Sequence, residues 1–80
     1  MGGVPQLRKA GLMAKDTLEW HDDMAVTVWR DGAAVASGRG LDRATALQDA
    51  WITLIDSRET DLAAWVASEY RKLTGQDPVR

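Results

Sequence analysis

The sequence predicts an α+β fold, in which a three-stranded antiparallel sheet precedes two helices that pack on one face of it. Two apolar periodicities support this prediction. Between residues 17 and 37, apolar side chains alternate with polar ones over short runs, which is typical of strands. Between residues 42 and 73 they recur every three or four positions, which places them on one side of a helix. That apolar stripe needs a covering layer, and we expect the sheet to supply it.

The first strand is predicted over Thr17–His21, where Leu18 and Trp20 alternate with charged or polar neighbours. Asp22 and Asp23 follow directly and predict a turn. Leu18 and Trp20 therefore share one face of the sheet.

The second strand is predicted over Ala25–Trp29, because its β-branched and aromatic residues favour a pleated sheet. If Val26 and Val28 face the helices, pleating turns Trp29 to the opposite face. A two-layer fold leaves that opposite face open.

The dipeptide Asp31-Gly32 predicts a tight hairpin turn, because both residue types accept positive φ values. The third strand is then predicted over Ala33–Ser37, centred on Val35. The glycines of Gly38-Arg39-Gly40 are expected to end the sheet.

The first helix is predicted over Arg43–Ile55. Asp42 is a suitable N-cap, and Leu41 could pack onto the first turns as a hydrophobic staple. The polar run Asp56–Asp61 interrupts the apolar stripe, which favours two helices over one long rod.

The second helix is predicted over Leu62–Leu73, with Gly75 as the residue that ends it and Pro78 beyond. Together with the strands, the helices give a predicted core of Leu18, Val26, Val28, Val35, Leu47, Trp51, Leu54, Ile55, Leu62, Val66 and Leu73.

Residues 1–15 are predicted to be a flexible N-terminal segment, because few apolar residues anchor them, and residues 16–76 a single α+β domain. The chain has no cysteine, which excludes disulfides, thiolate metal sites and thiol nucleophiles. No apolar run reaches the roughly 18 residues that cross a bilayer. We therefore expect a cytoplasmic protein that does not associate with a membrane.

The acidic residues are concentrated in the predicted domain. The formal charge of the whole chain is −2, but Arg8, Lys9 and Lys15 all lie in the first fifteen residues. The folded part is therefore more acidic than the chain as a whole. An acidic domain repels phosphate backbones and is attracted to basic surfaces.

No catalytic or metal-binding constellation is apparent in the sequence. His21 is the only histidine, and two adjacent carboxylates, Asp22 and Asp23, converge poorly on one ion. The pair Gly38-x-Gly40 precedes a helix, but it lacks the third glycine and the lysine of phosphate-binding loops. We expect a protein that is not an enzyme and that uses no metal or cofactor.

Trp29 is the leading candidate for a contact residue, because it is expected on the open face and because Trp and Arg are enriched at interface hot spots. In the alternative interpretation, Trp29 packs under the N-terminal segment or in a homodimer. Carboxylates on the two predicted turns would offer negative charge to a basic partner. The predicted partner-binding residues are Trp29, Arg30, Asp22, Asp23, Asp56 and Glu59.

Residues 25–55 resemble the last two strands and the final helix of the double-stranded RNA-binding domain. The resemblance rests on Val-Thr-Val-Trp-Arg-Asp-Gly from Val26, on Gly38-Arg-Gly40, and on the alanine-rich helix start that includes Arg43. It implies that basic residues at the helix start grip RNA phosphates. Arg43 matches that basic cluster, and Arg39 lies close by in the sequence.

The same stretch is similar to some small phage-encoded anti-CRISPR proteins, which are short, cysteine-free single domains with such a hairpin and helix. This resemblance implies a non-catalytic inhibitor that occupies a basic, nucleic-acid-binding surface of a host surveillance complex in the host cytoplasm.

Three functions stay open at the level of sequence. The leading hypothesis is a protein-binding module, encoded by a phage or mobile element, that inhibits a host CRISPR or other nucleic-acid-handling complex. The second is a divergent double-stranded RNA-binding-like domain that uses Arg39 and Arg43. The third is a small homodimeric scaffold with Trp29 in its interface.

Overall fold

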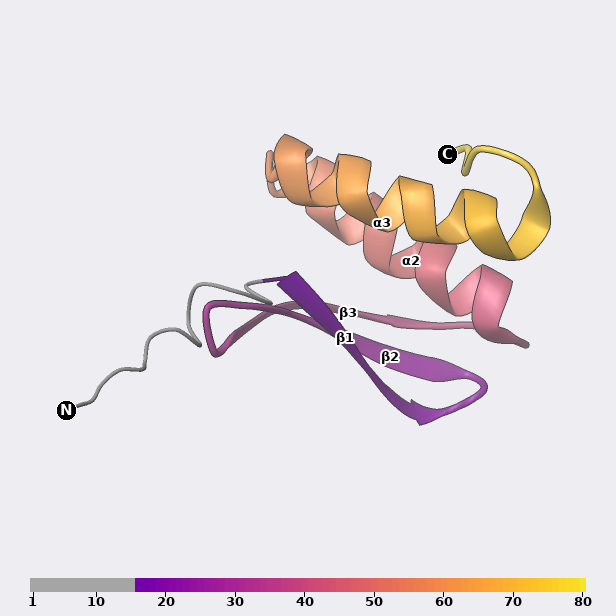
Figure 1. Cartoon of the computed structure of the whole chain (residues 1–80), viewed down its shortest axis with the longest axis horizontal. Coiled ribbons are helices and arrows are strands. Elements are labelled where there is room, and N and C mark those ends of the chain that lie inside the picture. The colour runs from indigo at the N-terminus through magenta and orange to yellow at the C-terminus, as the bar shows by residue number, and fades with distance from the viewer. Residues whose placement is uncertain (1–15) are drawn as a thin grey trace, which may run out of the picture.

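The computed structural model describes residues 16–80, and the segment predicted to be flexible, 1–15, lies outside them. Three strands, β1 (Asp16–Asp22), β2 (Ala25–Arg30) and β3 (Ala33–Arg39), form an antiparallel sheet in the order β1-β2-β3. Two helices, α2 (Arg43–Asp56) and α3 (Thr60–Thr74), cover one face of it (Figure 1). The predicted α+β fold is confirmed.

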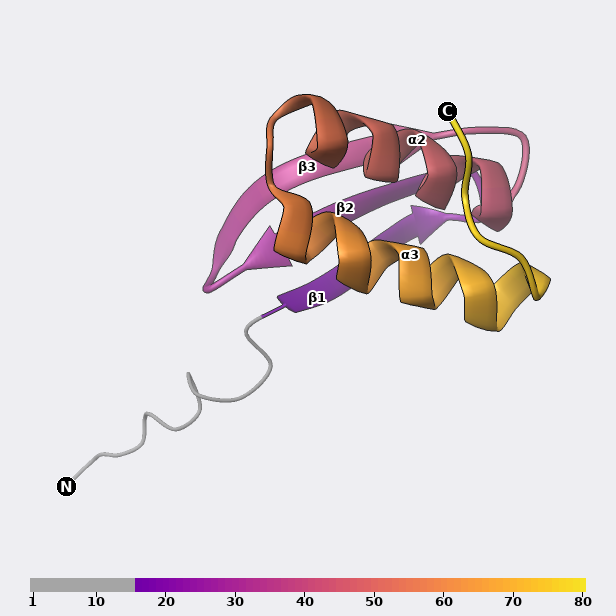
Figure 2. The same cartoon turned by 90° about the horizontal axis from the view of Figure 1, so that it is seen from above.

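The helix layer is not centred on the sheet. α2 packs on β2 and β3, and α3 packs on α2. Seen from above the helices, α3 runs on the β1 side of the molecule (Figure 2). The space between β1 and α3 is therefore bridged by side chains and not by close backbone packing.

Both hairpins follow from local residue chemistry. At the β2–β3 turn, Asp31 and Gly32 have φ values of 54° and 82°, which are those of the predicted tight turn. The β1–β2 turn is one residue later than predicted, because Asp22 still belongs to β1. The Asp22 carboxylate accepts a hydrogen bond from the Met24 N–H at 2.7 Å and so stabilises this turn.

The prediction that the sheet ends at Gly38 is wrong, because Gly38 and Arg39 belong to β3. Glycine is required at position 38 by packing. A Cβ atom there would lie 2.1 Å from the Ala46 carbonyl oxygen and 2.5 Å from the Ala50 nitrogen. Gly38 therefore lets α2 approach the sheet more closely than any side chain would allow.

The predicted start of the first helix is confirmed by a capping box. The Asp42 carboxylate accepts from the Thr45 N–H at 2.9 Å, and the Asp42 N–H donates to the Thr45 hydroxyl at 3.0 Å. The predicted staple is wrong, because Leu41 is 89% exposed. The preceding Gly40 is still hydrogen-bonded to Met24 across the sheet, and Leu41 projects into solvent as the chain leaves it.

The polar run after the first helix separates two helices, as predicted. Ser57 ends α2, and Arg58 adopts a left-handed φ of 65° in the short connection. Gly75 ends α3 in the left-handed region, and its N–H donates to the Arg71 carbonyl at 2.8 Å. The predicted roles of Asp42 and Gly75 are thus both confirmed.

The chain after Gly75 turns back over the helices. The Gln48 side-chain amide donates to the Val79 carbonyl at 2.7 Å, and Arg80 pairs with Asp56 at 2.6 Å. Pro78 is buried. Residues 77–80 therefore also pack on the domain predicted over residues 16–76.

Ten of the eleven predicted core residues lie in the core or pack against it, and Leu73 is the exception at 50% exposure. Leu73 is in the last turn of α3. The core also contains three small residues that the apolar stripe did not single out. These are Ala46, Ala50 and Ala63.

Candidate functional site

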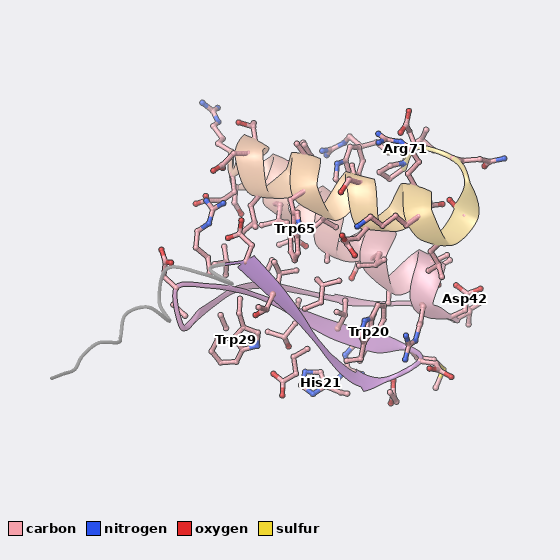
Figure 3. All side chains as sticks on the ribbon, in the orientation of Figure 1. Trp20, His21, Trp29, Asp42, Trp65 and Arg71 are labelled. Carbon is pink, nitrogen blue, oxygen red and sulfur yellow. The ribbon has the colours of Figure 1, made fainter. Side chains whose placement is uncertain are left out.

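The sheet face opposite the helices carries polar cross-strand pairs and one tryptophan. Glu19 lies opposite Thr27, and Thr17 lies opposite Trp29. Trp29 and His21 both project from this face, away from the helices (Figure 3). Among residues 16–80, no helix or strand covers it. We call the side chains of Thr17, Glu19, His21, Thr27 and Trp29 the open face.

The Trp29 ring is held in place by hydrogen bonding on the open face. Its indole Nε1–H donates to the Glu19 carboxylate at 2.9 Å, and the ring is half-buried. Beside it, the His21 Nε2 and the Thr27 hydroxyl are 2.7 Å apart. The indole N–H is satisfied while its apolar ring remains partly accessible, which suits a preordered contact residue.

The sequence prediction placed Trp29 on this face, but it did not name Glu19 and His21 as contact residues. The signal was available, because alternation along β1 puts both on the face opposite Leu18 and Trp20. The residues opposite them on β2 could not be predicted, because they depend on the register between β1 and β2.

Arg30 lies on the helix side of the sheet and is fully engaged within the protein. Its Nε and Nη2 donate to the two Asp16 oxygens at 2.8 Å and 3.2 Å, and its Nη1 donates to Asp61 at 2.9 Å. These bonds, first with Asp16 and then with Asp61, raise the pKa of Arg30. Arg30 thus joins β1, β2 and α3, and the structure does not bring it together with Trp29.

The predicted acidic contact residues lie at two separate turns. At the β1–β2 turn, Asp22 binds the backbone and Asp23 pairs with Arg43 at 3.1 Å. At the other site, Asp56 pairs with Arg80, and Glu59 caps α3 without a side-chain hydrogen bond. Exposed ion pairs contribute only about 0–1 kcal/mol, so a partner cation could replace Arg43 or Arg80.

The two arginines of the RNA-binding hypothesis differ in their surroundings. Arg43 donates to Asp23, and its guanidinium carbon lies 4.7 Å from the centroid of the Trp20 ring. Arg39 is exposed, and its backbone N–H donates to the Asp49 carboxylate at 3.0 Å. Each arginine therefore has a carboxylate close by, which weakens the positive field that phosphates require.

A shallow cleft of about 210 Å³ separates β1 from α3, and the sequence did not predict it. Its lining is mostly apolar on the sheet side, with Glu69 and Lys72 of α3 paired at 3.0 Å on the rim. The residues that line it are Leu18, Trp20, Arg43, Leu47, Glu69, Lys72 and Leu73.

Within residues 16–80, no three His, Asp or Glu side chains are placed to hold a metal ion together. Over the same residues, neither helix combines the length and apolar character needed to span a membrane. No family model, curated protein or solved structure matches the chain.

Proposed function

We propose that this protein is a non-catalytic protein-binding module whose contact surface is the open face. The observation that carries the proposal is the position of Trp29. A large indole lies on the side of the sheet without helices and is oriented there by Glu19 at 2.9 Å. Because the ring is held before binding, little side-chain entropy is lost when a partner covers it.

Charge supports a basic partner. All twelve acidic residues and only seven of the ten basic residues belong to residues 16–80, which gives this part a formal charge of −5. Three of the carboxylates, Glu19, Asp22 and Asp23, lie on or beside the strands of the open face. Complementary charge would steer a basic surface to this side of the molecule and speed association.

The partner class that we propose is a host complex with a basic, nucleic-acid-binding surface. The module would occupy that surface and keep nucleic acid from it, as the similarity to anti-CRISPR proteins implies. Such a complex lies in the cytoplasm of a host cell, where we place the module. The proposal requires no chemistry from the protein, only that its surface be complementary to that of its target.

Affinity capture from an extract of the host, with Trp29→Ala as the test variant, examines this proposal. We expect wild-type protein to retain a nucleic-acid-binding complex and Trp29→Ala to lose it. Leu41→Ala is the matched control, because Leu41 is 89% exposed and lies outside the open face. The captured complex should also lose affinity for its nucleic acid when the wild-type module is added. Thermal melts would establish that both variants are folded.

Two outcomes would contradict the proposal. Equal capture by wild type and Trp29→Ala would show that the partner does not bind through the open face. Salt-sensitive binding of double-stranded RNA that is lost in Arg39→Ala and Arg43→Ala would instead favour the RNA-binding alternative.

A further inference from the structure

Within residues 16–80, the outer edge of β1 is an open edge of the sheet. β1 has a neighbouring strand on one side only among residues 16–80. The other outer strand, β3, packs against α2, and the Asp49 carboxylate of α2 accepts a hydrogen bond from the outward-pointing Arg39 N–H at the end of β3. Proteins commonly protect sheet edges in this way, because an open edge pairs with other chains.

The backbone groups on the β1 edge can be assigned from the register. Asp31 and Gly32 form a two-residue turn closed by Arg30 and Ala33, so the backbone groups of Arg30 point toward β3. Alternation along β2 then directs Trp29 and Thr27 toward β1. A bulge shifts the alternation along β3 between Ala34 and Ala36, so the register pairs Arg39 with Ala25, whose backbone also points toward β1. The outward Arg39 N–H, bonded to Asp49, agrees with this assignment.

Thr17 lies across from Trp29, and Glu19 across from Thr27, so the backbone groups of Thr17 and Glu19 bond to β2. The backbone groups of the alternate residues along β1 point outward. These residues are Leu18 and Trp20. Within residues 16–80, no side chain bonds to their N–H and C=O groups, so an added strand could pair with them.

The side chains beside this edge define what an added strand would carry. On the helix side, Leu18 and Trp20 form the sheet wall of the cleft of about 210 Å³, whose lining also includes Leu47 and Leu73. Apolar side chains of an added strand would enter this cleft. On the open face, alternate side chains would lie beside Thr17, Glu19 and His21.

The negative charge of β1 favours a basic strand at this edge over a second copy of β1. β1 carries three carboxylates, those of Asp16, Glu19 and Asp22, and no lysine or arginine. A second copy paired antiparallel about Glu19 would place Glu19 against Glu19 and Asp16 against Asp22, and such like-charge pairs are unfavourable. A strand with lysine or arginine on its open-face side would instead place cations beside Glu19 and within reach of the Trp29 ring.

We propose that the β1 edge is a strand-addition site for an extended segment of a partner protein in which basic residues alternate with apolar ones. The segment pairs with Leu18 and Trp20 through its backbone, antiparallel like the rest of the sheet. Its apolar residues occupy the cleft and its basic residues face Glu19 and Trp29. This inference rests on the proposed protein-binding function and specifies the form that the partner takes.

The test uses a capped peptide, Lys-Val-Lys-Val-Lys-Val-Lys, and amide hydrogen exchange of the full chain followed by NMR. We expect the Leu18 and Trp20 amides to exchange at least about tenfold more slowly when the peptide is bound, because both become hydrogen-bonded. The Glu19 amide already bonds to β2, so its exchange rate should change little. The same peptide with N-methylated valines cannot donate to the edge and should give no protection.

Charge is tested with a matched pair of variants. Glu19→Gln keeps an acceptor for the Trp29 indole and should weaken peptide binding by about two- to fivefold, the effect of losing one exposed ion pair. Asp31→Asn removes the same charge at the β2–β3 turn, where asparagine also accepts a positive φ, and should leave binding unchanged. A Glu-Val peptide of the same pattern should bind at least about tenfold more weakly than the Lys-Val peptide.

Peptide binding without protection of Leu18 and Trp20 would overturn the strand-addition site and leave the module proposal intact. The same is true if the peptide does not bind while a partner is still captured through Trp29. Protection of these two amides that rises with protein concentration, without peptide, would assign the edge to a second copy and overturn the proposal. Capture that does not depend on Trp29 would instead contradict the proposed function itself.

Discussion

Gly38 is the residue on which the contact between the two layers depends. Because a Cβ at this position would meet the backbone of Ala46 and Ala50 at 2.1 and 2.5 Å, α2 must move if any side chain is added. We expect Gly38→Ala to lower the free energy of unfolding by about 1–3 kcal/mol, measured by urea denaturation. Ser37→Ala, one position earlier on the exposed side of β3, should change it by less than about 0.5 kcal/mol. Equal effects would contradict the close packing of α2 on β3.

Asp42 makes the start of α2 sensitive to acid. Hydrogen bonds from the Thr45 N–H and then from the Thr45 hydroxyl hold the pKa of this carboxyl below its usual 3.8. The unfolded chain lacks these bonds, so its pKa there is higher. Ionised Asp42 therefore stabilises the folded state above the unfolded pKa, and that contribution is lost as pH falls through the folded pKa.

The Asp42→Asn variant isolates this effect, because asparagine caps helices about as well as aspartate but does not titrate. We expect the Tm of wild type to fall more than that of Asp42→Asn between about pH 5 and pH 2. The hydrogen bond with Arg30 also lowers the pKa of Asp61. Asp61 is present in both proteins, so its contribution to the change in Tm cancels when the two are compared. Parallel Tm curves would show that the cap is not linked to protonation.

Residue-level predictions from sequence succeeded where the signal is local. Asp42, Asp31-Gly32 and Gly75 were identified because a cap or a positive φ depends on the residue and its immediate neighbours. The engagement of Arg30 with Asp61, thirty-one positions away, depends on how α3 crosses the sheet. No short-range pattern in the sequence encodes that contact.

At the scale of elements, the two helices bury different parts of their apolar stripes. Leu54 in α2 is fully buried, whereas Leu73 in the last turn of α3 is 50% exposed. We expect Leu54→Ala to destabilise the protein by about 2–5 kcal/mol in urea denaturation, through lost burial and a residual cavity. Leu73→Ala makes the same chemical change and should cost less than about 0.5 kcal/mol. Similar losses for both variants would contradict the observed core.

The order of elements could be predicted because each has its own periodicity, and the predicted bounds were close to those observed. The end of β3 could not be predicted, because a glycine at position 38 has two structural interpretations. A glycine near a strand end suggests a break in the sheet, but here it serves the approach of α2. Only the tertiary packing distinguishes the two.

At the scale of the whole molecule, the formal charge of −5 over residues 16–80 predicts salt-dependent binding to basic ligands. The Debye length falls from about 30 Å at 0.01 M salt to about 3 Å at 1 M. We expect the association rate with the Lys-Val peptide to fall steeply over this range, and the dissociation rate to change less. Stopped-flow fluorescence measures both rates. An association rate that does not depend on salt would contradict a role for charge in peptide binding.

The candidate surface could be predicted only in part. Pleating alone placed Trp29 on the uncovered face, but its bond to Glu19 needed the β1–β2 register. The cleft beside β1 was not predictable, because it arises from the lateral offset of α3, which strand and helix periodicities do not specify.

Fluorine NMR of protein containing fluorotryptophan tests the central claim most directly, because Trp29 and Trp51 then report separately. Trp29 lies on the open face, and Trp51 packs against the core from α2. On addition of the Lys-Val peptide, the Trp29 resonance should shift with the binding curve while the Trp51 resonance stays in place. A bound peptide that leaves the Trp29 resonance unmoved would contradict the claim that proteins are bound through this face.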